Sequence, residues 1–441
     1  MSSSREMASI KVGLLGLGVV GGGTWKVLQN NAEEIARRAG RRIEVTAVAV
    51  RDVEKARKLL GDSDVRITTD GLEVARDPNI DIVVELIGGE TTAREWVMEA
   101  IRQGKHVVTA NKALLAKHGN EIFDTASGKG VMVMFEAAVA GGIPIIKAIR
   151  EGLTANRINW IAGIINGTTN FILSEMQSRG LPFNTVLAEA QRLGYAEADP
   201  TLDIEGVDAA HKLTLLASLA FGIPVQFEKA CVEGISKLEA EDIQHAARLG
   251  YRIKLLGITR RREDGIELRV HPTLIPMGCL LANVDGAMNA VLVHGDVVGP
   301  TLYYGQGAGE MPTASAVVAD LVDVARLESA DPEHRVPYLA FQPDAVKDIP
   351  ILSADNIQSS YYLRLRVEDR PGVLSEISRI LADSGISIGS MFQEPNEPGE
   401  ASIIFLLHRA REGAVSTAIQ KMHELPFVRS EVTRLRVEDL I

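Results

Sequence analysis

Residues 10–21 read Ile-Lys-Val-Gly-Leu-Leu-Gly-Leu-Gly-Val-Val-Gly, an apolar run that ends in the pattern Gly-x-Gly-x-x-Gly. Because the glycines follow a predicted strand and open a predicted helix, this pattern favours a dinucleotide-binding turn over a glycine-rich turn without a ligand. We expect Gly16 to permit the tight turn, Gly18 to let backbone amides approach a pyrophosphate, and Gly21 to let the helix approach the strand. The predicted cofactor-binding residues of this turn are Gly16, Leu17, Gly18, Val19, Val20 and Gly21.

Further apolar, β-branched runs follow in the first third of the chain and alternate with amphipathic segments. Short runs that are covered by helices on both faces are what a parallel sheet requires. We therefore predict an α/β fold with a Rossmann-type doubly wound parallel sheet. The predicted strands are 10–15, 43–50, 82–86, 106–109 and 131–135, and the predicted helices are 23–38 and 92–103. This nucleotide-binding domain is expected to span residues 1–136 and to be completed by about residues 310–330.

The middle of the chain changes to long helical patterns followed by strand-like runs. This change predicts a separate α+β domain over residues 137–309. Its predicted helices are 170–179, 184–193 and 207–221, and its predicted strands are 253–258 and 266–270. A glycine-rich strand and loop then lead into a helix that we expect to begin at Pro312, with Thr313 as its cap.

The last part of the chain reads as a linker followed by a small domain. Residues 331–358 hold several Pro and Asp residues with weak periodicity, which is typical of a connector. Residues 359–441 show the order β-α-β-β-α-β of a ferredoxin-like domain. The predicted strands are 361–367, 386–393, 401–408 and 428–437, and the predicted helices are 372–384 and 413–424.

The composition favours small-molecule chemistry. The 441 residues carry 47 Lys and Arg against 58 Asp and Glu, a net charge of −11, which disfavours a general role in binding nucleic acid or an anionic membrane. Cys231 and Cys279 are too few for a disulfide framework or a four-cysteine zinc site, which indicates a reducing, cytoplasmic location. The first nine residues lack the apolar stretch of a signal peptide, and the apolar runs are too short or too broken for a transmembrane helix.

The residues after the second predicted strand bear on the choice between NAD and NADP. An acidic residue there favours NAD, whereas an arginine accommodates the 2′-phosphate of NADP. Arg51 and Asp52 both follow this strand, so we expect NADP through Arg51, while Asp52 leaves NAD open. Arg57 and Lys58 could assist, or they could be solvated surface residues.

Charged residues gather in two places that suit catalysis. Lys112 follows the fifth predicted strand, at the edge where doubly wound sheets bind ligands. Asp208 and Lys212 are four residues apart on one helix and therefore share a face. Alone, such a pair is usually a surface ion pair, but the local density of acids favours a site for a substrate ammonium and a proton donor. The acids are Glu197, Asp199, Asp203, Glu205 and Asp208.

A third feature is the loop at residues 135–144, which reads Phe-Glu-Ala-Ala-Val-Ala-Gly-Gly-Ile-Pro. It is a strand end that turns into a glycine loop. Backbone carbonyls that are freed in such a loop can bind a hard cation, although a plain turn between domains has the same pattern.

Taken together, six motifs in order resemble homoserine dehydrogenase. They are GLGVVG (16–21), VTANKALLA (108–116), FEAAVAGGIP (135–144), INGTTNFIL (165–173), GYAEADPTLDIEGVDAAHK (194–212) and GQGAGEMPTASAV (305–317). The motif at 194–212 is the most specific of them. Residues 369–377, Asp-Arg-Pro-Gly-Val-Leu-Ser-Glu-Ile, resemble an ACT regulatory domain, as in the monofunctional bacterial enzymes. We expect no aspartate kinase domain before the first strand.

The resemblance implies NAD(P)-dependent interconversion of L-aspartate 4-semialdehyde and L-homoserine, on the way to threonine, methionine and isoleucine. It implies that Lys212 is the proton donor, that Asp208 is its substrate-binding partner and that Lys112 lies between nicotinamide and substrate. The other residues that it assigns are Glu197 and Asp203 on the substrate, Gly307 and Gly309 near the nicotinamide, and the carbonyls of Glu136, Val139, Gly141 and Ile143 on a monovalent cation such as sodium.

The ACT resemblance also bears on regulation and assembly. It implies an amino-acid effector such as L-threonine and a homodimer or homotetramer. Two alternatives remain at this point. A phosphorylating aspartate-semialdehyde dehydrogenase needs a catalytic Cys beside a His, a context that neither cysteine has. A non-catalytic amino-acid sensor with Rossmann and ACT domains is disfavoured because Lys112, Glu197, Asp208 and Lys212 are all present.

Overall fold

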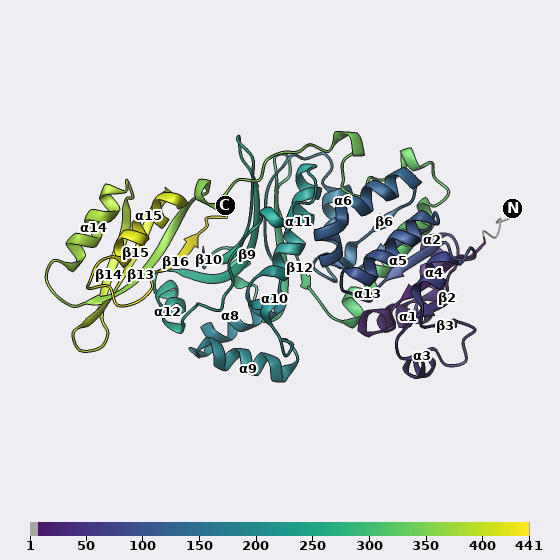
Figure 1. Cartoon of the computed structure of the whole chain (residues 1–441), viewed down its shortest axis with the longest axis horizontal. Coiled ribbons are helices and arrows are strands. Elements are labelled where there is room, and N and C mark those ends of the chain that lie inside the picture. Colours follow the sequence, from purple (N-terminus) through teal and green to yellow (C-terminus); the bar gives the residue numbers. More distant parts are fainter. Residues whose placement is uncertain (1–7, 441) are drawn as a thin grey trace. The chain divides into compact units, whose positions relative to one another are not determined.

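The computed structural model describes residues 8–440, so most of the polar N-terminal segment lies outside the described residues. The chain divides into two compact units (Figure 1). The first unit comprises the chain up to Ile161, together with Asp208–Glu228 and Met288–Ile349. The second comprises Ala162–Val207, Lys229–Ala287 and the chain from Pro350 onward. Within residues 8–440, the structure has no helix with the length and apolar character needed to span a membrane.

The first unit is built on a six-stranded parallel sheet in the order β3-β2-β1-β4-β5-β6. Its strands are β1 (Ile10–Leu15), β2 (Ile43–Ala49), β3 (Arg66–Thr68), β4 (Ile82–Glu85), β5 (His106–Thr109) and β6 (Val133–Met134). The direction of winding reverses between β1 and β4, which is where doubly wound sheets bind ligands. The predicted fold class is confirmed, and β1 and β5 match their predicted ranges.

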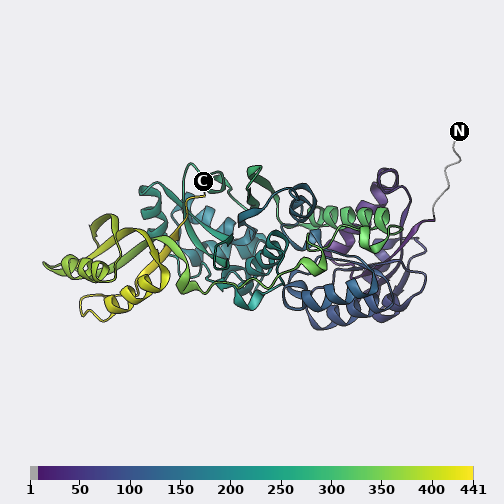
Figure 2. The same ribbon diagram turned by 90° about the horizontal axis from the view of Figure 1, so that it is seen from above.

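Helices cover both faces of this sheet. Figure 2 shows α13 on one face and α5 and α6 on the other. The helices are α1 (Val19–Asn30), α2 (Ala32–Ala39), α3 (Val53–Leu60), α4 (Gly71–Arg76), α5 (Thr91–Arg102), α6 (Lys112–Lys129) and α13 (Glu310–Leu327). The single helix predicted over 23–38 is wrong. Two helices are separated at Asn31, whose φ of −112° and ψ of 19° leave the helical region.

The start of α13 also differs from the prediction. The helix begins at Glu310 and not at Pro312, and its N-cap is Gly309, whose φ of +126° is a conformation that side chains disfavour. Thr313 therefore lies in the first turn and caps nothing. A Cβ added at Gly23 would lie 2.9 Å from the Glu310 carbonyl oxygen, so a glycine in α1 lets α13 pack closely on it.

The rest of the first unit adds a hairpin and a buried helix. β11 and β12 pair antiparallel, and α11 is buried along almost its whole length. Residues 207–221 are the helix that the sequence predicts. The elements are α7 (Ile145–Lys147), β7 (Ile158–Ile164, which ends in the second unit), α11 (Val207–Phe221), β11 (Met288–Gly295) and β12 (Gly299–Gln306).

The second unit begins with helices and a long antiparallel pair, β9 and β10. Its elements before residue 350 are α8 (Gly167–Arg179), α9 (Phe183–Leu193), α10 (Thr201–Ile204), β8 (Cys231–Val232), α12 (Ala240–Arg248), β9 (Tyr251–Arg261) and β10 (Ile266–Pro276). Both long strands extend beyond their predicted ranges. β9 continues at both ends through polar and charged residues, and β10 continues through residues 271–276, because the antiparallel ladder includes residues that an apolar run does not mark.

The ACT region has the predicted order β-α-β-β-α-β and forms an antiparallel sheet, β16-β13-β15-β14. Its elements are β13 (Gln358–Glu368), α14 (Val373–Asp383), β14 (Ile388–Pro395), β15 (Glu400–Arg411), α15 (Glu412–His423) and β16 (Thr433–Val437). The two helices share one apolar core with the sheet. β16 also pairs in parallel with β10, at Thr273 with Arg436, so the ACT sheet continues directly into the β9–β10 pair.

Candidate active site

The glycine turn after β1 has the geometry that a close-approaching ligand needs. Gly16 has a φ of +100°, and a Cβ on it would lie 2.9 Å from the Leu86 carbonyl oxygen. A Cβ on Gly21 would overlap the carbonyl oxygen of Gly16, so α1 can pack against the turn only with glycine there. A Cβ on Gly18 would meet nothing within 4 Å. Gly18 is the N-cap of α1, so the helix begins at an open surface with its first amides unpaired.

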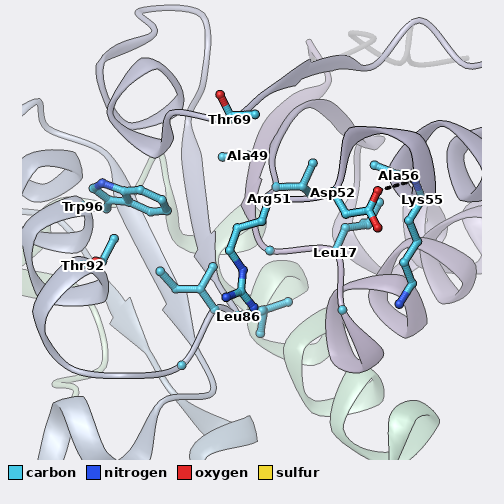
Figure 3. A pocket seen from close by; sticks show the side chains of 15 residues that line it. Leu17, Ala49, Arg51, Asp52, Lys55, Ala56, Thr69, Leu86, Thr92 and Trp96 are labelled. Carbon is cyan, nitrogen blue, oxygen red and sulfur yellow. Dashed lines mark hydrogen bonds between the residues drawn. The ribbon is translucent and has the colours of Figure 1, made fainter.

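A cavity of about 450 Å³ lies at this turn, between the carboxyl ends of β1, β2 and β4. Gly16, Leu17 and Gly18 form part of its wall, whereas Val19, Val20 and Gly21 continue into α1. Figure 3 shows the Arg51 side chain extending into the pocket toward Leu86. Sequence reasoning missed the other walls, which include Lys55, Thr69, Thr92 and Trp96.

Arg51 and Asp52 differ in what their side chains do. Asp52 is the N-cap of α3, and its carboxylate accepts a hydrogen bond of 3.0 Å from the amide of Lys55 (Figure 3). The acid is thus used for helix capping. Arg57 pairs with Glu54 on the exposed side of α3 at 3.1 Å. Of the basic residues predicted near the cofactor, only Arg51 lies in the pocket wall.

Glu85, at the end of β4, is a residue that the sequence analysis missed. Its side chain is completely buried, and burial raises the pKa of its carboxyl. It accepts hydrogen bonds from the Thr109 hydroxyl at 2.6 Å and from the amides of Ile87 and Gly88 at 2.9 and 3.1 Å. Ile87 and Gly88 line the cavity at the glycine turn. The hydrogen bonds of Glu85 to their amides therefore fix one wall of this cavity.

Asn111 continues this network from β5 to α6. Its side-chain oxygen caps the helix by accepting from the Leu114 amide at 3.0 Å, and its amide group donates to the Gly89 carbonyl at 2.7 Å. Lys112 is the first residue of α6 and is therefore fixed at the carboxyl edge of the sheet. In the Thr-Ala-Asn-Lys motif, the asparagine thus caps α6 and the lysine is the first residue of that helix.

The two lysines predicted to be catalytic meet at one carboxylate. The Lys212 ammonium lies 2.6 Å from Asp208 Oδ2, and the Lys112 ammonium lies 3.2 Å from Asp208 Oδ1. Asp208 and Lys212 are buried, while 39% of the Lys112 side chain is exposed. A carboxylate between two ammonium groups holds both cations in place by charge-assisted hydrogen bonds. His211, on the same helix, packs on Phe227, and burial lowers the pKa of its imidazole.

The acidic motif of the second unit is held by hydrogen bonds to its helices. The Asp203 carboxylate accepts from Asn166 Nδ2 at 2.7 Å, and the Asn166 side chain also caps α8. Thr168 donates to the Tyr195 carbonyl at 2.7 Å, and Gln191 donates to the Glu197 carbonyl at 3.1 Å. Glu197 itself is exposed. Asp199 is instead used for a local turn, where it accepts from the Thr201 hydroxyl at 2.6 Å.

The loop after β6 offers oxygen ligands of the kind that a hard monovalent cation prefers. Ala140 and Gly141 have φ values of +54° and +46°, an unusual pair of left-handed residues in sequence. Among the described residues, no backbone amide donates to the buried carbonyls of Val139 and Gly141. Buried carbonyls are normally paired, so these two fit a cation or a water. Those of Glu136 and Ile143 accept from Val139 and Ile145 and keep one lone pair each.

The side chain of Glu136 is buried beneath this loop. Its carboxylate accepts from the amides of Ile146 and Lys147 at 2.9 and 2.8 Å, and burial raises its pKa to about 7. The Glu136 amide in turn donates to Asp320 of α13 at 2.8 Å. Hydrogen bonds to the carboxylates of Glu136 and Asp320 therefore hold the start of this loop in place.

Gly307 and Gly309 lie on the loop before α13, which contacts the loop after β6. The Gly142 amide donates to the Gln306 carbonyl at 3.0 Å. A Cβ on Gly141 would lie 2.5 Å from the Gly307 carbonyl oxygen. The two loops thus touch backbone to backbone.

Other catalytic chemistry finds little support among residues 8–440. Burial raises the pKa of the Cys231 thiol, which is the opposite of what a nucleophilic cysteine needs. Both cysteines are free, and no cluster of three or more His, Cys, Asp or Glu in that range could hold a metal ion.

Comparison with known proteins agrees with this geometry. Family models match at residues 16–136 (homoserine dehydrogenase, NAD binding domain), 144–322 (homoserine dehydrogenase) and 361–427 (ACT domain). Homoserine dehydrogenase of Pseudomonas aeruginosa is 61% identical over 98% of this chain and all of its own length. That of Neisseria gonorrhoeae is 56% identical over 98% and 100%.

Solved structures give the same result. A homoserine dehydrogenase from Thiobacillus denitrificans is 66% identical with a TM-score of 0.95, covering 99% of each chain. A hyperthermophilic archaeal homoserine dehydrogenase in complex with NADPH is 25% identical with a TM-score of 0.62, over 74% of this chain and 99% of its own. The full-length identity, the family matches and the shared fold therefore show that this chain belongs to the homoserine dehydrogenase family and is an oxidoreductase.

Proposed function

We propose that the protein interconverts L-aspartate 4-semialdehyde and L-homoserine with a nicotinamide dinucleotide, in the biosynthesis of threonine, methionine and isoleucine. The observation that carries this proposal is the pairing of Lys112 and Lys212 with the single carboxylate of Asp208. A reaction in which a carbonyl oxygen gains negative charge needs cations and a proton at that oxygen. Two lysines that share one acid supply both.

The residues have distinct roles in this mechanism. The Lys212 ammonium donates a proton to the carbonyl oxygen of the aldehyde and takes it back in the oxidation of homoserine. Asp208 orients Lys212 by a buried hydrogen bond of 2.6 Å. Lys112 stabilises the developing negative charge from the side of the nicotinamide. A bound nicotinamide dinucleotide supplies the hydride to the aldehyde carbon or accepts it from homoserine.

Glu197 and Asp203 bind the substrate, with Glu197 at its ammonium group. A carboxylate forms charge-assisted hydrogen bonds with an ammonium, which are stronger than neutral ones. The hydrogen bond from Asn166 fixes one oxygen of Asp203 and supports a role for this acid in positioning a ligand.

The preferred cofactor is NADP, with NAD as the alternative. Support comes from Arg51, which points into the pocket, and from Asp52, which is occupied with capping α3. Gly16, Leu17 and Gly18 would hold the pyrophosphate at the start of α1, and Val19, Val20 and Gly21 supply its first turn. Gly307 and Gly309 would lie near the nicotinamide, as would Lys112.

The carbonyls of Glu136, Val139, Gly141 and Ile143 would hold a monovalent cation such as sodium. The left-handed pair Ala140–Gly141 and the unpaired carbonyls support this assignment. The cation would brace the loop against residues 306–309 and would take no part in proton transfer.

The ACT domain is proposed to regulate the enzyme by binding an amino acid such as L-threonine. The protein is proposed to be a homodimer or a homotetramer. Its domains would be 1–136 with about 310–330 for the dinucleotide, 137–309 for substrate and dimerisation, 331–358 as linker and 359–441 as the regulatory domain.

One experiment tests the central proposal. Absorbance of the reduced nicotinamide is followed with purified protein, L-homoserine and either NADP or NAD, with and without L-threonine. Homoserine-dependent reduction, faster with NADP, is expected. A folded protein that binds the dinucleotide but reduces none of it would contradict the assignment and favour an amino-acid sensor. Omitting homoserine is the control for background reduction.

A further inference from the structure

One segment of the second unit contacts both the ACT sheet and the end of helix α10, which carries Asp203. This segment, Glu233–Ile235, directly follows β8. β8 and β16 both pair in parallel with β10, at Arg269–Val270 and at Thr273–Leu274 respectively. The ladder continues through Glu233, whose amide donates to the Val270 carbonyl at 2.8 Å.

The side chain of Glu233 is bound to the last strand of the ACT domain. Its carboxylate accepts from Arg436 Nη1 at 2.9 Å and Nη2 at 2.7 Å, and from Arg434 Nη2 at 3.1 Å. Arg436 is buried and also donates through Nε to Glu412, the first residue of α15, at 2.7 Å. Such a two-pronged pair fixes orientation as well as distance.

The backbone of the same segment contacts the C-terminal end of helix α10. The Ile235 amide donates to the Ile204 carbonyl at 2.7 Å. A Cβ on Gly234 would overlap that carbonyl oxygen and would lie 2.5 Å from the Glu205 Cα. The two backbones are therefore in direct contact, one residue from Asp203.

We propose that Glu233 is a positioning residue for substrate binding, which fixes helix α10 and its Asp203 relative to strand β16 of the ACT domain. A shift of Arg436 would move Glu233, and the contact of Gly234 with Ile204 would carry that shift to the Asp203 carboxylate. The coupling needs only this chain of contacts. The inference rests on the proposed role of Asp203 in binding substrate.

The test compares two glutamates with matched surroundings. Glu233 pairs with two arginines of β16, and Glu241 of α12 pairs with Arg364 and Arg366 of β13. Glu233→Gln is expected to raise the KM for L-homoserine about fivefold, with kcat and the cofactor KM unchanged. Glu241→Gln is expected to leave all three constants unchanged. If both variants change the homoserine KM equally, Glu233 has no special role.

A second pair of variants perturbs the same end of helix α10 without removing a charge. Gly234→Ala should displace Ile204 and raise the homoserine KM as Glu233→Gln does. Gly278→Ala, where a Cβ meets nothing within 4 Å, is its control. Gly234→Ala also keeps the test decisive if Glu233→Gln fails to fold, because an unchanged KM in it overturns the proposal.

Two further measurements separate the possible failures. In the double variant of Glu233→Gln with Arg436→Lys, the KM should rise no further than in either single variant, because both break one link. Additive changes would contradict the link to the ACT strand. Asp203→Asn should itself raise the homoserine KM. If it does not, the proposed role of Asp203 fails. If it does while Glu233→Gln has no effect, only the present inference fails.

Discussion

The ammonium of Lys112 lies 3.2 Å from the carboxylate of Asp208, although the two residues come from different helices, α6 and α11. Lys212 binds the other oxygen of the same carboxylate. Removing any member therefore changes the surroundings of the other two. This arrangement makes the three residues a single ion-paired cluster.

Replacing Lys212 with Ala should remove the proton donor. We expect kcat to fall by about 100- to 10,000-fold, whereas the KM values for homoserine and cofactor change little, because the interaction strengthens in the transition state. Steady-state kinetics measure this. Lys117→Ala is the control. It removes an α6 lysine that forms an ion pair with Glu90, and it should keep full activity. A normal kcat in Lys212→Ala would exclude it as the donor.

Replacing Arg51 with Ala should weaken NADP selectively. Loss of a charged hydrogen-bond donor to the 2′-phosphate costs about tenfold or more in affinity. We expect the KM for NADP to rise by that factor and the KM for NAD to stay constant. Arg57→Ala should change neither, because Arg57 pairs with Glu54 on the surface. An equal rise in the KM for NADP and for NAD would mean that Arg51 does not bind the 2′-phosphate.

Replacing Gly21 with Ala should disrupt the cofactor turn. The new Cβ would overlap the Gly16 carbonyl, so α1 must move, at a cost of about 1–3 kcal/mol in unfolding free energy. Cofactor affinity, measured by titration calorimetry, should fall as well. Gly128→Ala in α6 is the matched control, since its Cβ meets nothing and should stabilise the helix by about 0.5–1 kcal/mol. Tight binding by Gly21→Ala would show that the turn tolerates the shift.

His106 should make stability depend on pH. Burial lowers the pKa of His106 to about 4, and its ring Nδ1 accepts a hydrogen bond from the Met132 amide at 2.9 Å. The unfolded chain, with a pKa near 6.5, binds the proton first as the pH falls. This contribution is therefore complete above about pH 6.5 and is lost toward pH 4, by about 3 kcal/mol.

Urea unfolding at several pH values measures this dependence. Other groups titrate in the same range, so the informative quantity is the difference between the wild type and His106→Gln. That difference should shrink as the pH falls from 6.5 to 4, because only the wild type loses the histidine contribution. A difference that is constant with pH would place the His106 pKa near its ordinary value.

Local patterns predict much of this fold, because the strands of a doubly wound sheet are short apolar runs whose ends are marked by glycines and caps. The ranges of β1, β5 and α11 can be read directly from the chain. The break at Asn31 and the early start of α13 at Glu310 could not be predicted. The start of α13 depends on its close packing against Gly23 of α1, and the break depends on the backbone angles of one residue, and periodicity reports neither.

The residues of the candidate site likewise fall into those that a sequence pattern indicates and those that it does not. Asp208 and Lys212 are visible because they are one helical turn apart. Glu85 is not, because a single acid at the end of an apolar strand has no pattern, and its function depends on hydrogen bonds to β5 and to the following turn. The contact of Glu233 with Arg436 joins residues 203 positions apart, and only the pairing of β16 with β10 brings them together.

The pairing of β16 with β10 also limits how copies of this chain can associate. An ACT sheet on its own has two open edges and could add neighbours on both sides without end. Here the β16 edge of the ACT strands is already hydrogen-bonded to β10 within the chain, and β14 is their open edge. The ACT strands can therefore join one partner through β14, after which both of their own edges are closed. Edge-to-edge growth through this domain therefore stops at two copies, and fibre formation by that route is prevented.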